Sequence, residues 1–466
     1  MHPYAFLTVV HTRIGHLLHY NYISQLLRHK KKLYMKKSLY VLVAIVLSSA
    51  MLSCSSSDDE YSRETKQVVN MLSESQPVEL TKEQKVFVND NNCFTLNFLK
   101  TVNETDRSGK SFIYSPLSIT YVLGMVNDAA TGQTEQELEQ TLGFHKGGIK
   151  AVNEYCKNLI DNLPKVDEKV KLNIANAIFL NQRYTLKEQF QKDMEQYYDA
   201  KAEALDFSSS KTLDHINGWC NNKTNGMIPT ILDEVNPNMM SYLLNAIYFK
   251  ADWASKFDTK NTKKEPFTTE KGNKQLPLMH QAVLINYLRN DTYAAVDIPY
   301  GNGNWSMMVM LPEEGKTIDD IIAILAIIGK SVNFSNNPIS MVSPYEVDLK
   351  LPSFETSSDT DDMEEGLIGL MQKMGVKMAF DPLCEEICNM CDLPVYIAMM
   401  RQKAKIKVNE EGSEAAAITV AGTMVTSVSV PKEYPKATFH ANRPFVYVIR
   451  EASSGVILFV GKFTGE

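Results

Sequence analysis

Residues 408–419 read Val408-Asn409-Glu410-Glu411-Gly412-Ser413-Glu414-Ala415-Ala416-Ala417-Ile418-Thr419. Immediately before them, basic and apolar residues alternate from Lys403 to Val408, which predicts a half-buried strand with its basic face in water. After that strand, about 30 residues (409–438) hold no credible buried element, although the domain around them is compact. Loops of that length are uncommon and are usually functional.

Two structures fit the first part of this loop. Its propensities favour a short surface helix, which is the expectation for the segment in isolation. Read with period two, its small uncharged residues share one face: Ser413, Ala415, Ala417 and Thr419. No proline lies between Glu410 and Pro431, so each N–H group can find a partner inside a sheet. With Gly412 as a hinge, the loop has the pattern of an unused strand attached to a used one.

The surrounding chain predicts one α+β domain from Thr81 to Glu466, without a repeat or a Gly/Ser-rich linker. A capping box at Thr134 and Glu137 predicts the start of a helix that ends at Gly143. Further helices are expected at 152–160, 187–198 and 214–224. Strands are expected at 174–180, 242–249, 307–311, 445–449 and 456–460, the last two joined by a turn at 453–455.

The N-terminal region predicts an exported protein. Residues 38–50 are an apolar run behind Lys36 and Lys37, too short for a transmembrane span and ordered like a signal peptide. We therefore expect a signal peptide at 35–53 with Met35 as the true start, and residues 1–34 as an untranslated upstream stretch. Residues 54–80 are then a polar linker to the folded domain.

Cys54 is a candidate lipidation site. The stretch Met51-Leu52-Ser53-Cys54 resembles a bacterial lipobox, with Met51 where Leu is usual, and the acidic run at 55–60 resembles an export signal of surface lipoproteins. The expected localisation is the cell surface, with an anchor in outer-membrane lipid through Cys54, or the extracellular space. A plain secretory signal with an incidental Cys54 stays open as the alternative.

The charge of the chain argues against nucleic acid as a partner. The formal net charge is −7, but the first 53 residues hold seven of the 48 basic residues and no acidic one. The remainder has 41 basic against 55 acidic residues, a net charge of −14. Such a body repels phosphate backbones at long range.

An enzyme is the first rival class of function. Four histidines follow the leader: His145, His215, His280 and His440. None accompanies a Gly-x-Ser-x-Gly or His-Glu-x-x-His motif, and no phosphate-binding loop is found, so we expect neither an enzyme nor a cofactor.

Three cysteines with C-x3-C-x2-C spacing raise the question of a metal site. Cys384, Cys388 and Cys391 offer three ligands, whereas structural zinc needs four, and no nearby fourth ligand is evident. No metal is predicted. Free thiols and a local disulfide both remain as interpretations.

Taken together, segments along the domain resemble the serpin family, over nearly all of Thr81–Glu466. The most specific mark is the segment 408–417. The other marks follow in family order: Ser115-Pro116-Leu117-Ser118-Ile119, Asn245-Ala246-Ile247-Tyr248-Phe249-Lys250 with Trp253, Leu351-Pro352-Ser353-Phe354, Phe439-His440-Ala441-Asn442-Arg443-Pro444-Phe445 and Leu458-Phe459-Val460-Gly461-Lys462. The chain is accordingly identified as a bacterial, lipoprotein-type, inhibitory member.

The resemblance implies a fold of three β-sheets, eight or nine helices and an exposed reactive-centre loop. It implies a monomer without a cofactor that inhibits serine endopeptidases, with cysteine endopeptidases as a further class. The target protease attacks the loop and forms an acyl-enzyme. The cleaved loop then inserts into the main sheet as a new strand and carries the covalently bound protease along.

Residue roles follow from the same resemblance. The hinge of the loop is Glu410, Glu411, Gly412, Ser413, Glu414, Ala415, Ala416, Ala417 and Thr419. The shutter beneath the opening strands matches Ser115, Pro116, Ser118 and Asn245, and the breach where insertion starts matches Trp253. One departure is Gln402, where the family often has His. An amide both donates and accepts hydrogen bonds, so the shutter network is expected to survive without its pH response.

Family spacing places the reactive bond at Thr426–Ser427. Met424 and Val425 precede it, which suits elastase-like or subtilisin-like proteases with small or apolar pockets. The segment from Ser427 to Phe439 is longer than the family's, so a bond one or two residues from Thr426 stays open. The rival within the family is a non-inhibitory binding or chaperone-like protein. Such members tend to carry bulky, charged or proline residues in the hinge, whereas the alternate positions that would face inward here are the small, uncharged Ser413, Ala415, Ala417 and Thr419.

Overall fold

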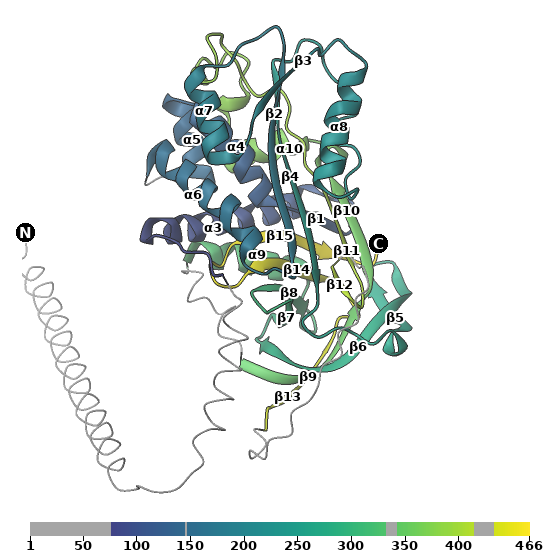
Figure 1. Ribbon diagram of the computed structural model, residues 1–466. Coiled ribbons are helices and arrows are strands. Elements are labelled where there is room, and N and C mark those ends of the chain that lie inside the picture. Colours follow the sequence, from purple (N-terminus) through teal and green to yellow (C-terminus); the bar gives the residue numbers. More distant parts are fainter. Residues whose placement is uncertain (1–75, 145–146, 332–342, 414–432) are drawn as a thin grey trace, which may run out of the picture. The chain divides into compact units, whose positions relative to one another are not determined.

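The computed structural model describes residues 76–144, 147–331, 343–413 and 433–466 (Figure 1). These residues form a mixture of helices and sheets, which confirms the α+β class expected from the sequence. Their α-helices are α3 (Lys82–Thr105), α4 (Pro116–Ala129), α5 (Gly132–Leu142), α6 (Gly148–Asn162), α7 (Glu188–Tyr198), α8 (Lys211–Lys223), α9 (Ile318–Ser331) and α10 (Gly366–Met374).

The largest sheet has nine strands, in the order β1-β15-β14-β8-β7-β6-β9-β13, with β5 paired to β6. Its strands are β1 (Phe112–Tyr114), β5 (Lys263–Thr269), β6 (Gly272–Arg289), β7 (Tyr293–Tyr300), β8 (Trp305–Pro312), β9 (Ser343–Pro352), β13 (Lys436–His440), β14 (Phe445–Glu451) and β15 (Ile457–Phe463). The hairpin of β14 and β15 turns at Gly455, whose φ of 78° suits glycine, as the sequence predicted.

Two smaller sheets meet through one short strand. The first contains β2 (Lys171–Asn181), β3 (Ala202–Leu205) and β4 (Ser241–Asp252), and the second contains β10 (Phe354–Asp359), β11 (Lys403–Val408) and β12 (Gly412–Ser413). Because β12 pairs antiparallel with both β11 and β4, it joins the two into one six-stranded order, β10-β11-β12-β4-β2-β3. The functional site lies where β12 joins these two sheets.

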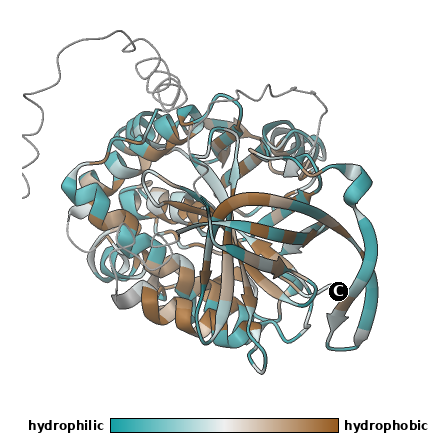
Figure 2. Cartoon of the chain, turned by 90° about the horizontal axis from the view of Figure 1, so that it is seen from below, coloured by the Kyte–Doolittle hydropathy of each residue, from teal (hydrophilic) through white to brown (hydrophobic). Residues whose placement is uncertain are grey.

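The apolar side chains of the two faces of β4 enter different clusters. Phe249 and Ala251 face the main core, whereas Tyr242, Leu244 and Ala246 pack with α8 in a second cluster. Hydrophobic colours accordingly gather on the central strands, and hydrophilic ones lie on the outer faces of the helices (Figure 2). The alternation along β4 therefore sets which side of this sheet any neighbouring residue enters.

Local signals explain where the first helices begin. Thr81 caps α3 with a capping box shared with Gln84. Ser115 caps α4 by accepting the N–H of Ser118, and Pro116 occupies the first helical position, where its missing N–H is no loss. Ahead of α3, Val78 is buried, so the described part of the predicted linker lies against the domain.

Two expectations from the sequence are corrected here. The capping box at Thr134 and Glu137 is wrong, because α5 already begins at Gly132 and the N–H of Thr134 donates to the Glu386 carboxylate (2.7 Å). The helix does end at Gly143, as predicted. The second correction concerns the long loop, which is shorter than 409–438 because β12 and β13 occupy both of its ends. Both errors arise from long-range contacts.

Candidate functional site

Immediately after β11, the chain turns back and enters the sheet beside it. The N–H of Asn409 donates to the carbonyl of Gly412 (2.9 Å), and Asn409 Oδ1 accepts the N–H groups of Glu411 (3.0 Å) and Gly412 (3.2 Å). Past this turn, Gly412 and Ser413 form β12, in which Ser413 pairs with both β11 and β4. The start of the predicted hinge is therefore already a strand between β4 and β11.

Glycine is required at position 412 for a steric reason. A Cβ atom there would collide with the carbonyl oxygen of Ala251 and lie 2.6 Å from the Cα of Asp252. Both of those atoms are backbone of β4 and cannot move aside without breaking the strand pairing. The sequence predicted a hinge from glycine's conformational freedom, and the structure adds the close approach of two backbones.

The side chain of Ser413 is buried in a small polar pocket of an aromatic cluster. Its exposed fraction is 1%, and its hydroxyl shares a hydrogen bond of 2.6 Å with the hydroxyl of Tyr300. Burial raises the pKa of Tyr300 well above its usual range, so the phenol stays neutral. The Tyr300 ring stacks on Trp253 at 4.3 Å between centroids, and Trp253 Nε1 donates to the carbonyl of Asn409 (2.9 Å). A larger residue at 413 has no space in this arrangement.

The first two glutamates of the hinge, Glu410 and Glu411, hold the turn from outside. Glu411 pairs with Lys256 (2.5 Å), which also pairs with Asp252 of β4 (2.9 Å). Partial burial opposes the charge of Lys256, but these carboxylates outweigh it and raise the Lys256 pKa. Glu410 accepts a hydrogen bond from the hydroxyl of Thr262 (2.7 Å). The base of the loop is thus anchored on the strand it enters.

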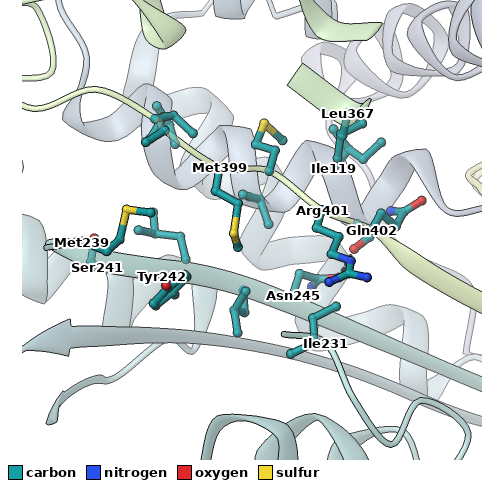
Figure 3. A pocket seen from close by; sticks show the side chains of 18 of the residues that line it. Ile119, Ile231, Met239, Ser241, Tyr242, Asn245, Leu367, Met399, Arg401 and Gln402 are labelled. Atoms are coloured by element: carbon teal, nitrogen blue, oxygen red, sulfur yellow. Dashed lines mark hydrogen bonds between the residues drawn. The ribbon is translucent and has the colours of Figure 1, made fainter. Parts of the chain in front are cut away.

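Further along β4, a cavity of about 420 Å³ separates it from β11 and from the segment that precedes β11 (Figure 3). Within the described ranges, β12 pairs with β4 only at Ala251 and Asp252, so the rest of β4 lacks a described strand on this side. The cavity is lined by large side chains such as Met239, Tyr242 and Met399, and by the polar residues Asn245, Arg401 and Gln402. The cavity therefore continues the path on which β12 has started.

Ser115 and Gln402 close one side of this cavity with reciprocal hydrogen bonds. The N–H of Ser115 donates to Gln402 Oε1 (3.0 Å), and Gln402 Nε2 donates to the carbonyl of Ser115 (2.7 Å). The hydroxyl of Ser115 donates to the carbonyl of Leu458 on β15 (2.8 Å). The amide thus makes the two kinds of hydrogen bond that the sequence led us to expect in place of His.

Ser118 and Asn245 form the second polar contact of the cavity. The hydroxyl of Ser118 donates to Asn245 Oδ1, and Asn245 Nδ2 donates to Asn176 Oδ1 on β2 (2.8 Å). Asn176 Nδ2 in turn donates to the carbonyl of Tyr198 at the end of α7 (2.7 Å). This chain of amides ties α4, β4, β2 and α7 together beneath the cavity.

The predicted site residues therefore form two groups along one path. At the end where β12 enters, the structure brings together Glu410, Glu411, Gly412, Ser413 and Trp253. Further along, the cavity is lined by Ser115, Ser118, Asn245 and Gln402, and Pro116 follows Ser115 as the first residue of α4. The remaining predicted residues lie outside the described ranges: Cys54, Glu414, Ala415, Ala416, Ala417, Thr419, Thr426 and Ser427.

Sequence reasoning missed several partners in the site. Asn176 had a usable signal, because it is a polar residue in the middle of the apolar run 174–180. Tyr300 and Lys256 had none, since their contacts with the hinge, to Ser413 and Glu411, join residues more than 100 positions apart. Long-range pairing of this kind has no local pattern to reveal it.

The cysteines and histidines considered in the sequence lie elsewhere. Cys384 and Cys391 are buried and Cys388 is exposed, all as free thiols. In the part of the chain that the structure describes, no group of three or more His, Cys, Asp and Glu is arranged to hold a metal ion. His280 and His440 both contact Asp348 through Nε2, at 2.6 and 2.9 Å. His145 lies outside the described ranges.

Comparison with known proteins places this geometry in context. A family model described as serpin (serine protease inhibitor) matches residues 89–465. Serpin B6 from Bos taurus is 31% identical, with 80% of this chain and 97% of that protein covered. Neuroserpin from Gallus gallus is 27% identical, with 76% and 86% covered.

Solved structures give the same result for the fold. The thermophilic serpin tengpin in its native state has a TM-score of 0.70 at 25% identity, covering 84% of this chain and 96% of that one. Thyroxine-binding globulin in complex with thyroxine has a TM-score of 0.66 at 26% identity, covering 80% and 97%. These likenesses confirm the three-sheet fold that the sequence resemblance implied.

Proposed function

Because the chain belongs to the serpin family, we propose that it inhibits serine endopeptidases by offering the loop after β11 as a substrate and trapping the acyl-enzyme. One observation carries this proposal. Gly412 and Ser413 are already paired between β4 and β11, and a cavity lies further along between the same two strands. A cleaved loop can extend that pairing by adding residues to β12.

The register of β12 specifies how this extension runs. Ser413 lies opposite Ala251 and Val408. In antiparallel pairing, six further residues of the loop correspond to six fewer on each neighbour, so Thr419 would enter between Asn245 and Gln402. Residues at every second position would follow Ser413 toward the core, and these are the small residues found in the sequence.

The proposed trap works by distance and distortion. About 13 residues from Glu414 to Thr426 remain to be inserted after β12, and at ~3.4 Å each they move the attached protease by roughly 40–45 Å. Pulling on the acyl group displaces the oxyanion donors of the protease, and each lost donor costs about 3–4 kcal/mol of transition-state stabilisation. Deacylation then stalls with the covalent bond intact.

Target class and location complete the proposal. We propose that the reactive bond is Thr426–Ser427 or a bond one or two residues away. Such a bond suits elastase-like or subtilisin-like enzymes, because Met424 and Val425 are apolar. We further propose a monomer exported to the cell surface or the medium, with Cys54 as the lipid anchor. Among the described helices, none is both long enough and apolar enough to cross a bilayer.

A binding function is the second candidate, because thyroxine-binding globulin shares the fold. The buried, small Ser413 favours inhibition instead, since strand entry requires a residue of this size at the mouth of the gap. A carrier that never inserts its loop has no such requirement.

Incubation of the purified chain with pancreatic elastase and with subtilisin tests the proposal. On a denaturing gel, we expect a covalent band at the sum of the two masses, and the released C-terminal peptide should begin at Ser427 or within two residues of it. Trypsin serves as the comparison, because Lys432, the nearest basic residue after the hinge, lies beyond the proposed bond. Complete cleavage without any covalent band would contradict the proposal.

A further inference from the structure

The chain between α8 and β4 forms a strap, residues 225–236, that packs on the β4 side of the cavity. Asn217 of α8 holds it, because its Oδ1 accepts the N–H groups of Ile231 (2.8 Å) and Leu232 (2.9 Å) and its Nδ2 donates to the carbonyl of Leu232 (2.9 Å). Ile231 and Leu232 are buried with Tyr242 and Leu244 of β4. This part of the strap therefore moves with β4.

The next residue of the strap contacts the opposite side of the cavity. Asp233 pairs with Arg401 (2.6 Å), and Lys403 of β11 lies 3.9 Å from the same carboxylate. Arg401 precedes β11 and is also held by Asp359 of β10 (2.6 Å), so it belongs to the β10–β11 side. In Figure 3, Arg401 points from its segment toward the part of the strap that carries Ile231. Asp233 thus bridges the two sides.

The remaining charges around Arg401 do not make the same bridge. Asp361, which lies 3.0 Å from Arg401, follows β10 and stays on the same side as Arg401. Hydrogen bonding to Arg401 lowers the pKa of Asp233, so its carboxylate is ionised at neutral pH. Asp233 is 71% exposed, whereas Arg401 is only 10% exposed. Replacing the aspartate therefore leaves Arg401 with its other carboxylates and disturbs little else.

We propose that Asp233 is a latch that holds the strap against Arg401 and so limits the rate at which β4 and β11 part to admit a strand. The inference rests on the proposed function, since it assigns a rate-controlling contact to the same gap. At the end where β12 enters, backbone pairing joins β4 to β11. At the strap, the exposed Asp233 joins the two sides through its ion pairs with Arg401 and Lys403, and these must break before the gap can widen.

Strand entry can be measured on the intact full-length chain without a protease. The probe is a synthetic peptide with the sequence of residues 414–426, which follow the residue already in the sheet, and its uptake is followed on a native gel over time. Asp233→Asn should take up the peptide about two- to five-fold faster than the wild type, the factor expected for one exposed ion pair. Asp233→Glu, which restores the carboxylate, should return the rate to within two-fold of the wild type.

Salt separates a latch from a general loss of stability. Raising NaCl from 0.05 to 0.5 M should speed uptake by the wild type and leave Asp233→Asn unchanged, because salt screens an exposed pair that the variant lacks. The matched control is Asp161→Asn, which removes the exposed Lys157–Asp161 pair (2.9 Å) on α6 and should behave as the wild type.

Equal uptake rates and equal salt dependence in wild type and Asp233→Asn would overturn the latch. Absence of uptake by any variant would overturn it as well, since β4 and β11 would then not part under these conditions. The protease gel described above is an independent measurement. If no covalent band forms but Asp233→Asn takes up the peptide faster than the wild type, the proposed inhibitor function is wrong and the latch role of Asp233 is supported.

Discussion

Ser413 is the residue at which the sequence pattern and the geometry of the site agree most closely. It is buried, bonded to Tyr300 and paired with both β4 and β11. Ser413→Arg places a long cation where no space exists, so β12 should leave the sheet and insertion should fail at its first step. We expect the variant to be cleaved by elastase as a substrate, with at least a ten-fold lower yield of covalent complex on a denaturing gel.

Arginine at an unrelated serine controls for this substitution. Ser210 precedes α8, makes no capping hydrogen bond and is exposed, so Ser210→Arg should keep the wild-type yield of complex. A Ser413→Arg protein that traps elastase as well as the wild type would mean that the loop does not inhibit by entering between β4 and β11.

The sequence predicts a residue of this site when its role depends on neighbours along the chain, and fails to predict it when the role depends on contacts with distant segments. The alternation of Lys403 to Val408 predicts β11 correctly, because burial on one face of a strand is a local pattern. Gly412 and Ser413 are recognisable from their small size. Tyr300 is not, because its role comes from the pairing of β7 with β8 and from contact with a strand far along the chain.

Elements show the same division between local and long-range signals. The ends of α5 illustrate it, since Gly143 stops the helix through its own left-handed conformation, whereas Glu386 reaches Thr134 from a distant segment. The strap is a further case. Its anchoring by Asn217 and its ion pair with Arg401 join segments whose sequences carry no sign of each other.

Three helices meet at a buried carboxyl group that makes the packing sensitive to pH. The carboxyl group of Asp128 on α4 accepts a hydrogen bond from Asn153 Nδ2 on α6 (2.5 Å). The hydroxyl of Tyr198 on α7 donates a hydrogen bond to Asn153 Oδ1 (2.8 Å). Desolvation raises the pKa of Asp128 to about 6, although its hydrogen bond with Asn153 opposes the rise. The folded state therefore binds this proton more tightly than the unfolded state, whose Asp pKa is about 3.9.

A raised pKa in the folded state means that stability falls as pH rises from about 4 to about 6 and stays lower above that. The loss of stability is on the order of 3 kcal/mol. Asp128→Asn removes it and keeps an oxygen for Asn153. The variant should therefore have a higher urea midpoint than the wild type at pH 8 and a similar one at pH 4.5. As a control, Asp161→Asn at an exposed position should have the same urea midpoint as the wild type at pH 8. If Asp128→Asn also has the wild-type midpoint at pH 8, the Asp128 carboxyl group is adequately solvated and the prediction is wrong.

Among the described residues, Gly412 and Ser413 of β12 join the six-stranded order, and a cavity of about 420 Å³ lies further along the same gap. Under the proposed mechanism, cleavage of the loop permits about a dozen new backbone hydrogen bonds, at ~1 kcal/mol net each, and fills that cavity with side chains. The same mechanism requires that the intact fold be held by a kinetic barrier and not be the most stable arrangement of the chain. Protein nicked in the loop should therefore unfold at a temperature at least about 10 °C higher than intact protein, since roughly 8 kcal/mol of added stability produces such a shift in a domain of this size. Differential scanning calorimetry of both forms measures this shift, and nicked Ser413→Arg should not show it, because its strand cannot enter. Equal melting temperatures for intact and nicked wild-type protein would show that the gap between β4 and β11 stores no free energy for inhibition.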